Sequence, residues 1–489
     1  MTSFRSSRLL RPLLISTIAG FGFIGFGLYV GGAVAFLCVA VVGVGSVVVI
    51  TRVTVLQVAL LSATASALTA PWNAVLIASV RPSDALLVLS LGCFLAVGID
   101  RRLITLPSWL IQLAAVILAL TILHEAFPTS PTYLTGRDVF DGLGRPVPEA
   151  FTNLGIAGRW LVSLLGIPLM VGFAVGRRRD AARWIAMAYV AGAAVSGFVA
   201  LADGLGVTTI SPIFIAPGGR QTGLTLQPNH LAAAAALALP ICVWLIVQRE
   251  RRSPIYGASC LTGIVIGLYE SGSRGGAAAS VLAVVLSLTL MRRLRRKMPL
   301  VFSGVISLIL VAVVALPALA SQVARTTRLS GNAAGVASSN NARELLATQA
   351  LHDFVHSPLS GIGLQVTLDA HSIYLQLLAA GGVLLLSSML IFVVGALRTA
   401  LYMESADECN VALLVSLLAW LAFGTVENGL TDRYLYFPVA LIVALSTRSR
   451  LYEGRVRPDP LLVGEVTPPL NASCSNIASR TLVECRTDE

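Results

Sequence analysis

The chain has 489 residues, of which 56% are hydrophobic and only 12% charged, and its mean hydropathy is +0.82. A soluble protein covers its surface with polar groups, so this composition excludes an ordinary soluble enzyme and indicates an all-α polytopic membrane protein. The net charge of +11 does not indicate a nucleic-acid partner, because the basic residues form small clusters between apolar segments, where they carry topology information.

Apolar segments of about 20 residues, the length that crosses a bilayer as a helix, recur along the chain. The expected helices cover residues 13–30, 33–50, 53–70, 84–99, 107–123, 157–176, 183–203, 229–248, 254–270, 277–291, 299–320, 372–396, 409–427 and 432–447. The first tight hairpin and the short last helix are the weakest of these, so the prediction is about 12–14 transmembrane helices. Arg5, Arg8 and Arg11 precede the first apolar run, and no cleavage site ends that run, so we expect this helix to be retained.

The arginines predict the orientation. With the N-terminus inside, most of the 35 Lys and Arg residues fall in cytoplasmic segments, which favours a cytoplasmic (inner) membrane protein with both termini cytoplasmic. Residues 124–156, 204–228 and 321–371 then lie outside. All five histidines fall in or beside these stretches, although histidine is disfavoured in lipid anyway. Residues 1–447 are expected to form the membrane bundle, and the polar residues 448–489 a disordered cytoplasmic tail.

The long extracytoplasmic loop, residues 321–371, is expected to contain short helices, one of them amphipathic and lying on a surface. Its apolar side would carry Leu346, Ala350 and Phe354, with Leu351 and Val355 alongside. Its polar side would carry Arg343, Glu344 and Asp353. Ser357-Pro358 should end this helix, and the sequence SGIG at 360–363 should turn the chain.

The sequence lacks two common sources of chemistry. The seven cysteines form no CxxC pair, so neither a disulfide framework nor a cysteine metal site is predicted. A GxxxxGK[ST] phosphate loop is also absent, so nothing supports an ATP-driven pump. We therefore expect no cofactor.

The first stretch of chemical interest is GRQTGLTLQPNH, residues 219–230, at the expected outer entrance of a helix. Arg220 and the N–H groups of the helix start at Pro228-Asn229 would share one polar surface, which suits a phosphate or pyrophosphate. The alternative is a capped loop, with Asn229 as the N-cap and Arg220 against lipid head groups.

The second stretch is ESGSRGG, residues 270–276, at an expected outer turn between two apolar helices. The positive-inside rule disfavours an arginine there, which indicates a functional role for Arg274. The competing structural explanation is an ion pair with Glu270. The glycines and serines would let the backbone approach a bulky anion closely.

The third stretch is DAHSIY, residues 369–374. His371 would stand at the outer end of a helix, where an imidazole can exchange a proton near neutral pH. The alternative is a rim histidine whose hydrogen bonds are all satisfied by the protein. His352 and His356 are spaced to share a helix face and could hold a metal, but no third ligand is evident, so we predict no metal site.

In this order the three stretches resemble the O-antigen ligase and O-antigen polymerase family of bacterial membrane glycosyltransferases. The resemblance is carried by RQTGLTLQPNHLA, by SGSRGG, and by HSPLSGIG followed by AHSIYLQLLAAGGVLLL. It covers roughly residues 215–400, whereas the N-terminal helices are similar to the family only as generic membrane helices.

The resemblance implies a metal-independent, inverting transfer at the outer face of the membrane, in cell-surface or exopolysaccharide biosynthesis. The donor would be a glycan on undecaprenyl pyrophosphate. The acceptor would be a lipid-linked core glycan in ligases, a growing glycan in polymerases, or a protein serine in the related oligosaccharyltransferases. The implied partners are these substrates, membrane lipids and polysaccharide-assembly proteins, with no nucleic acid.

Residue by residue, Arg220 and Arg274 are similar to the family's two essential arginines, and His371 to its essential loop histidine. The guanidinium groups would stabilise the leaving pyrophosphate, and His371 would act as a base or orient the acceptor. Arg343 could contact glycan or phosphate, or only a lipid head group. The family usually has His-Asn where this chain has His371-Ser372, which puts in question the hydrogen bond that the amide would supply.

A transporter or flippase of a lipid-linked glycan is the rival from another class. Transporters tend to have charged residues near the middle of the membrane and paired broken helices. Here the charges in the expected spans, such as Asp203 and Glu270, lie close to the helix ends. This pattern favours an enzyme at one face of the membrane.

Overall fold

The structure is a computed structural model, and it describes residues 54–76, 80–98, 106–128, 153–178, 180–211, 219–248, 253–296, 334–364, 370–403 and 408–456. The helices predicted at 13–30, 33–50 and 299–320 lie outside these residues. The chain divides into Met1–Ser449 and Arg450–Glu489. Beyond Val456 the predicted tail is also outside the described part, so its disorder stays a prediction.

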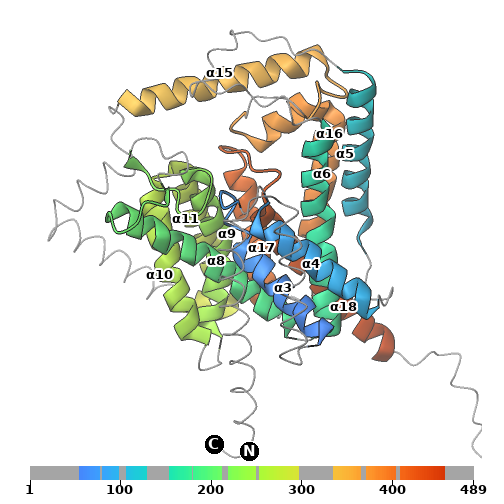
Figure 1. The fold of residues 1–489 in the computed structure, drawn as a ribbon, viewed down its shortest axis with the longest axis vertical. Helices are drawn as coiled ribbons and strands as arrows, with labels where there is room; N and C mark the ends of the chain where they lie inside the picture. Colours follow the sequence, from blue (N-terminus) through green and yellow to red (C-terminus); the bar gives the residue numbers. More distant parts are fainter. Residues whose placement is uncertain are drawn as a thin grey trace, which may run out of the picture. The chain divides into compact units, whose positions relative to one another are not determined.

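The described chain is built from α-helices, as predicted, with short π and 3₁₀ turns between some of them (Figure 1). They are α3 (Val55–Thr69), α4 (Pro82–Val97), α5 (Ser108–Ala126), α6 (Asn153–Leu161), η3 (Val162–Gly166), α7 (Ile167–Arg177), α8 (Ala181–Gly204), α9 (Pro228–Val247), α10 (Ser253–Ser271), α11 (Arg274–Leu290), α12 (Arg292–Arg295), α15 (Ala334–His356), α16 (Ile373–Tyr402), α17 (Glu408–Phe423), η6 (Arg433–Leu435) and α18 (Tyr436–Val456).

Five of the described segments are long and apolar enough to cross a membrane: α5, the continuous α6–η3–α7 segment, α8, α9 and α16. The shorter helices α3, α4, α11 and α17 are also apolar. The class predicted from composition, an all-α polytopic membrane protein, is confirmed. The number of 12–14 crossings stays a prediction.

α9 lies at the centre of the bundle. It packs against α8, α10, α11 and α17. Within its most apolar stretch, 83% of the residues are buried. The sequence explains this position, because Leu231–Leu239 is apolar on every side and mostly alanine, and small side chains let helices approach closely. The first turn of α9 is therefore held firmly, and it carries Asn229 and His230.

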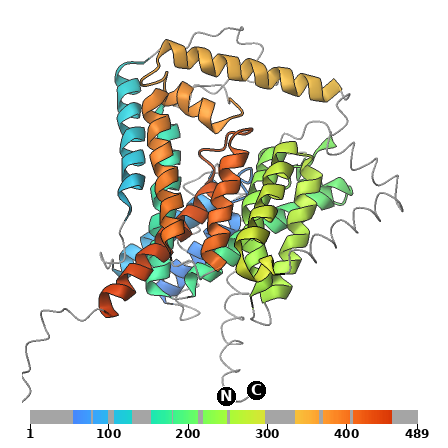
Figure 2. The same ribbon diagram turned by 180° about the vertical axis from the view of Figure 1, so that it is seen from behind.

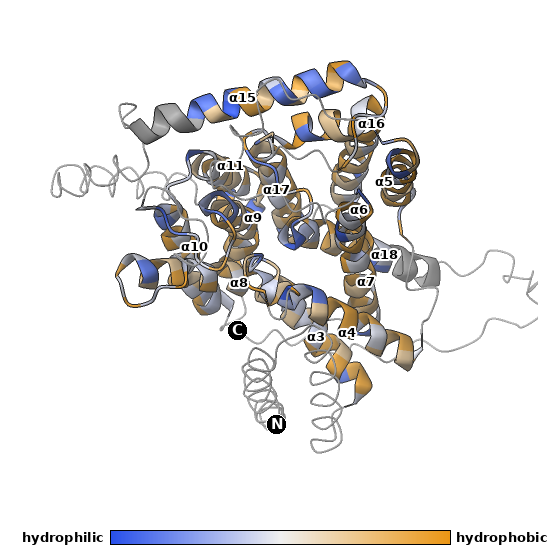
Figure 3. Ribbon diagram, turned by 45° about the horizontal axis from the view of Figure 1, so that its top comes forward, coloured by the Kyte–Doolittle hydropathy of each residue, from blue (hydrophilic) through white to orange (hydrophobic). Residues whose placement is uncertain are grey.

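Large apolar side chains remain exposed on the outside of the bundle, among them Val88, Ile122, Ile255, Val281 and Leu401. In water such surfaces would be unfavourable, but lipid tails are as apolar as these side chains. Figure 3 shows apolar residues along the helices and polar ones at their ends and on α15. This distribution fits a bundle surrounded by lipid.

α15 lies across the ends of the helices at one side of the bundle (Figure 1). It is 23 residues long, so it begins well before the predicted surface helix, and it ends at His356, where Ser357-Pro358 was expected to stop it. It packs on α16 through Ala350, which clusters with Ala370 and Ala379.

The predicted faces of this helix are partly wrong. Leu351 and Val355 are 49% and 74% exposed, whereas Asp353 is buried. On the covered side, Ala350 clusters with Ala370 and Ala379, and the Asp353 carboxylate accepts a hydrogen bond from Gln349 Nε2 at 2.8 Å. A polar residue can replace an apolar one on the covered side when its hydrogen bond is made.

α16 is broken near its start. Gly382 has a non-helical conformation inside it, with φ of 59° and ψ of −156°, and Figure 2 shows the two parts of the helix at a steep angle. The SGIG turn pairs with the backbone exposed by this break. The hydrogen bonds run from the N–H groups of Ile362, Gly363, Val383 and Leu384 to the carbonyl oxygens of Ala379, Ala380, Pro358 and Leu359.

Glycine is required on both sides of this pairing. A Cβ atom on Gly361 would lie 2.3 Å from the backbone of Ala380, and one on Gly382 would lie 2.5 Å from the backbone of Leu359. Both residues also have positive φ, which side-chain-bearing residues rarely adopt. The buried His124 of α5 adds to the attachment, since its Nε2 lies 3.1 Å from the carbonyl oxygen of Gly361. The turn therefore ties α5, α15 and α16 together.

Candidate active site

All three stretches selected from the sequence contribute to one hydrogen-bond network. His371 Nδ1 lies 3.2 Å from Glu427 Oε1, and Glu427 Oε2 accepts a hydrogen bond from Asn229 Nδ2. The other end of the same amide, Asn229 Oδ1, accepts from Arg220 Nη2 at 2.7 Å. Arg220 Nε donates to the carbonyl oxygen of Ser271 at 2.6 Å. We call the end of the bundle that carries this network the polar end.

Glu427 is the centre of the network and was not predicted as a site residue. It lies in the loop between α17 and η6, and its side chain is only 1% exposed. Burial opposes its ionisation. The hydrogen bonds from His371 and Asn229, with the positive charge of His230 and His371 when they are protonated, nevertheless hold the pKa of Glu427 below its usual range. Glu427 is therefore a carboxylate at neutral pH.

The backbone of His371 is strained. It is the only described non-glycine residue with positive φ, at 47°, a conformation that occurs mainly where the surrounding structure imposes it, often at functional sites. The next residues hold it there: Ile373 N–H donates to the carbonyl oxygen of Gly424 at 2.8 Å. The imidazole is about one-quarter exposed, so it lies at the surface of the network and not inside it.

The structure shows what orients His371, although Ser372 stands where the resemblance predicts an asparagine. Ser372 is the N-cap of α16 but makes no capping hydrogen bond with its side chain. Its carbonyl oxygen instead accepts from Gln376 N–H at 2.9 Å. His371 is oriented by Glu427, so a neighbouring amide is not required for that purpose.

Arg274 is the first residue of α11, directly after the N-cap Ser273, whose side chain accepts a hydrogen bond from Gly276 N–H. Its side chain is exposed and donates to Asn340 Oδ1 on α15 at 3.2 Å. Among the described residues there is no ion pair between Arg274 and Glu270, so the predicted competing explanation is not observed. Arg274 lies three residues after Ser271, the carbonyl partner of Arg220, and both arginines thus belong to the same end of the bundle.

Asn229 belongs to this network, whereas no described contact joins Arg343 to it. Asn229 is the second residue of α9 and not its N-cap, which is Gln227, so the predicted capping alternative is wrong. Arg343 lies half-buried on α15, and no described hydrogen bond or ion pair joins it to the other candidates. In the described ranges no group of three or more His, Cys, Asp or Glu side chains could hold a metal ion.

A second polar cluster, also not predicted, lies beside the first. His230 follows Asn229 on α9, and its Nδ1 is 3.2 Å from Asp432 Oδ2 and 2.9 Å from Asn73 Nδ2. Asn73 Nδ2 also donates to Asp432 Oδ1 at 3.0 Å. Arg81 Nη1 lies 3.6 Å from the same oxygen. Thus adjacent residues of α9, Asn229 and His230, hold the two carboxylates of one loop, Glu427 and Asp432.

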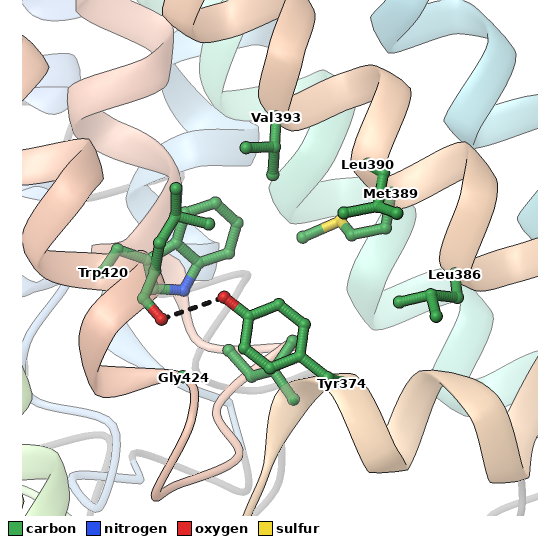
Figure 4. Close-up of a pocket in the computed structure, with 9 residues that line it drawn as sticks. Tyr374, Leu386, Met389, Leu390, Val393, Trp420 and Gly424 are labelled. Atoms are coloured by element: carbon green, nitrogen blue, oxygen red, sulfur yellow. Dashed lines mark hydrogen bonds between the residues drawn. The ribbon is translucent and has the colours of Figure 1, made fainter.

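An apolar recess lies between α16 and α17 (Figure 4). It encloses about 130 Å³ and is lined by Ile373, Tyr374, Leu386, Met389, Leu390, Val393, Trp420, Leu421 and Gly424. The Tyr374 hydroxyl donates to the carbonyl oxygen of Leu421 at 2.9 Å, so the hydroxyl is satisfied by the protein. Ile373 and Gly424 belong both to this recess and to the backbone contact that holds His371.

Two comparisons with known proteins were informative in different ways. Residues 258–393 match the family model described as O-Antigen ligase, which supports the predicted O-antigen ligase/polymerase family. No curated protein matches the chain. The matched segment contains Arg274 and His371, whereas Arg220, Asn229 and Glu427 lie outside it.

Proposed function

We propose, on the premise that residues 258–393 are those of an O-antigen ligase-type protein, that this chain moves a glycan from a lipid pyrophosphate to an acceptor hydroxyl. The family match supports ligase- or polymerase-type glycan transfer in general. The observation that carries the finer proposal is the His371–Glu427–Asn229–Arg220 network, because it joins a candidate base to a candidate anion-binding residue.

His371 is the base in this proposal. An ionised Glu427 next to Nδ1 favours the tautomer in which Nδ1–H donates to the carboxylate, and this makes Nε2 the basic nitrogen. The acceptor oxygen attacks the anomeric carbon of the donor glycan while its proton passes to Nε2. The resulting imidazolium is stabilised by Glu427, so the proton transfer becomes easier.

Arg274 and Arg220 act on the leaving group. As the bond between the anomeric carbon and the pyrophosphate oxygen breaks, the electron pair and the negative charge move to the pyrophosphate. Guanidinium groups stabilise that charge, because they are always protonated and bind phosphate in a bidentate manner. Attack opposite the departing pyrophosphate inverts the anomeric centre. The reaction needs no further energy source, since the donor is already activated.

The apolar recess holds the hydrocarbon part of the donor in this proposal. Its lining is mainly apolar: the Tyr374 hydroxyl is satisfied by the protein, and the other polar side-chain atom of the lining residues is the buried Nε1 of Trp420. Leu390, which also lines the recess, is 48% exposed. A hydrocarbon chain could therefore enter from the lipid and end near His371. The polar end would face the extracytoplasmic side of the inner membrane, as the arginine distribution predicts.

A reconstituted reaction tests this function. The purified chain, in lipid nanodiscs, is given an undecaprenyl-pyrophosphate-linked oligosaccharide and, in separate reactions, a core-lipid, a glycan or a serine-peptide acceptor. We expect release of undecaprenyl pyrophosphate together with a new glycosidic bond to one acceptor class. His371→Ala should lower the rate about 10²–10⁴-fold.

Two controls make the test decisive. Parallel vesicle experiments follow the sidedness of the donor. A donor that changes leaflet while its covalent structure stays intact would support a flippase and contradict the transfer reaction. A His371→Ala variant with a near-normal rate and pH profile would remove this residue as the base.

A further inference from the structure

Arg433 is a buried arginine at the end of the loop that carries Glu427. It is the first residue of η6, and its side chain is only 4% exposed. Burying a guanidinium is costly unless it is paired and its N–H groups find acceptors. Replacing such a group by an apolar side chain is often neutral or stabilising, so its best-attested role is to specify one arrangement of the chain.

The partners of Arg433 come from helices that lie far away in the sequence. Nε donates to Asp84 Oδ1 at 2.5 Å, in the first turn of α4. Nη1 donates to the carbonyl oxygen of Arg159 at 2.7 Å and to the hydroxyl of Ser163, both on the continuous α6–η3 segment. It also donates to the carbonyl oxygen of Thr431 at 3.1 Å, within its own loop. One side chain thus fastens the loop to α4 and to α6–η3.

The π segment η3 takes part in this attachment. Such segments are rare and frequently occur at functional sites. Ser163, on η3, is fully buried, and its Oγ lies 3.0 Å from the carbonyl oxygen of Arg159 and 3.3 Å from that of Thr431. Its single hydrogen can go to one of the two at a time, while its oxygen accepts from Arg433. Ser163 therefore links the helix to the loop and to the arginine together.

Buried aromatic side chains support the same loop at other points. The Tyr436 hydroxyl donates to the carbonyl oxygen of Leu430 at 2.5 Å and accepts from Trp160 Nε1 of α6 at 2.6 Å. The Tyr189 hydroxyl of α8 donates to the carbonyl oxygen of Tyr434 at 3.1 Å. The supports from α4, α6–η3 and α8 all precede residues 258–393, the segment matched by the family model.

Glu427 lies between two fixed points of this loop. On one side, the carbonyl oxygen of Gly424 accepts from Ile373 N–H at 2.8 Å, close to His371 in the sequence. On the other side, Arg433 holds the end of the loop on α4 and α6–η3. The position of the Glu427 carboxylate relative to the imidazole therefore depends on both attachments.

We propose that Arg433 is a positioning residue of the transfer reaction, which places the Glu427 carboxylate beside His371 by fixing the loop on α4 and α6–η3. Arg433 touches no reacting atom and acts through Glu427. The inference rests on the proposed function of His371, and it extends the working parts of the site to helices that the family match does not cover.

Charged and titratable groups surround the loop, so the test must leave their number unchanged. Glu427 is faced by His371, by His230 and by Tyr434. The ion pair of Arg433 with Asp84 and the cluster of Asp432, Arg81 and His230 lie at the other end of the loop. A variant that removed one of these charges would act on His371 through electrostatics alone. Only charge-conserving substitutions therefore report on position.

The test is the acid limb of the pH–rate profile of glycan transfer, where activity is lost as His371 becomes protonated. Arg433→Lys keeps the charge next to Asp84, but an ammonium cannot reproduce the forked contacts with Arg159, Ser163 and Thr431. The carboxylate of Glu427 should then move away from the imidazole and stabilise its protonated form less. We expect the acid limb to move to lower pH by roughly 0.3–1 unit and kcat to fall by up to about 10²-fold.

A double variant shows whether Arg433 acts through Glu427. Glu427→Gln alone should move the acid limb in the same direction and at least as far, because the carboxylate is lost entirely. Adding Arg433→Lys to Glu427→Gln should then move it no further. If Arg433 only stabilised the fold, Arg433→Lys would lower the amount of folded chain and the height of the profile but leave the limb in place.

A second variant and a matched control cover the case in which Arg433→Lys does not accumulate. Ser163→Ala removes one acceptor of Arg433 and the link to Thr431 without changing any charge, and it should move the limb in the same direction. Ser90→Ala is the control, because Ser90 is equally buried but bonds the carbonyl oxygen of Ala59, away from the loop. In this variant the limb should not move.

The result can be distinguished from a failure of the proposed function. If the wild-type chain transfers no glycan, the function fails, and the positioning role is then tested by NMR titration of the His371 imidazole in the purified chain, where the same displacements are expected. An acid limb or titration that moves in Glu427→Gln but stays in place in Arg433→Lys, or in Ser163→Ala where only that variant accumulates, would overturn this inference alone. One that Glu427→Gln does not move would contradict the role of Glu427 itself, and this inference with it.

Discussion

The two arginine-bearing turns at the polar end are built in opposite ways. Arg220 is half-buried and its guanidinium is held by Asn229 and by the carbonyl oxygen of Ser271. Arg274 is exposed at the start of α11, and its described hydrogen bond goes to Asn340 on the neighbouring surface helix. One arginine is part of the scaffold of the site, while the other can reorient toward a ligand at little cost.

This difference teaches that a shared chemistry does not imply a shared role. Arg220 links the candidate base to the second turn through Asn229 and Glu427, so it contributes to the stability of the site as well as to its charge. Arg274 contributes mainly its charge and its ability to reorient toward a ligand. Substitutions at the two positions should therefore separate stability from activity.

The largest expected effect is at these arginines. Arg274→Ala should lower the transfer rate by at least about 10²–10³-fold, because a cation that stabilises the charge on the leaving group is lost, and it should leave the melting temperature unchanged. Arg220→Ala should lower the rate similarly and also destabilise the chain, by about 1–3 kcal/mol for each partner left unsatisfied.

Reconstituted transfer assays and thermal unfolding in the same detergent measure both quantities. Membrane expression serves as the control for folding in each case. Undiminished product from Arg274→Ala would remove its pyrophosphate role, and equal melting temperatures for the two variants would contradict the contrast drawn between them.

The next effect concerns Glu427. Glu427→Gln keeps the shape of the side chain but removes the charge that orients and stabilises protonated His371, so the rate should fall about 10²-fold. The pKa of Glu427 is lowered in the folded chain, so its contribution to stability is present above its unfolded pKa, about 4.3, and is lost as the pH falls through the lowered value. The acid loss of stability should be smaller in Glu427→Gln. Unfolding curves from neutral pH to pH 3 would test this, and identical acid curves for the two chains would contradict it.

A smaller effect is expected in the apolar recess. Leu386→Trp should fill part of it and raise KM for the lipid-linked donor several-fold with little change in kcat, since only binding of the hydrocarbon chain is impaired. Val394→Trp is the matched control, because Val394 is 59% exposed on the same helix and does not line the recess. An equal rise in KM in both variants would mean that the recess does not hold the donor.

The smallest effect is expected at Arg343. We propose that it contacts the glycan at the edge of the site, where a charge near the surface contributes about 0–1 kcal/mol. Arg343→Ala should raise KM up to about fivefold, with kcat and the melting temperature unchanged. A large loss of kcat would show instead that Arg343 acts at the reacting centre.

Much of this site follows from sequence reasoning. Arg220 was selected because it would share a polar surface with the N–H groups of a helix start, and His371 because an imidazole at the outer end of a helix can exchange a proton. The structure joins them in one network. Arg274 was selected because the positive-inside rule disfavours an arginine at an outer turn. In the structure it contacts Asn340 of α15. Glu427 was missed because an acidic residue at the end of an apolar segment reads as an ordinary helix end. The cue that could have found it is the short, polar stretch ENGLTDR at 427–433, between two fully apolar segments.

The parts that could not be predicted depend on contacts between distant segments. Asn73 and Asp432 are 359 residues apart in sequence, and nothing local indicates that they meet. The covered face of α15 was predicted from apolar spacing, but it buries Asp353 together with Ala350, because Gln349 donates a hydrogen bond to the Asp353 carboxylate. Local pattern predicts which segments are helices, whereas the partners of their polar residues emerge only from packing.

The backbone pairing between the SGIG turn and the break in α16 holds the His356 end of α15 more firmly than its other end. At its His356 end the chain is held by main-chain hydrogen bonds, whereas near Asn340 the described attachment is the side-chain contact with Arg274. We therefore expect the Asn340 end of α15 to move more readily than the His356 end. Amide hydrogen exchange along α15 should accordingly be slowest toward His356 and fastest toward Ala334.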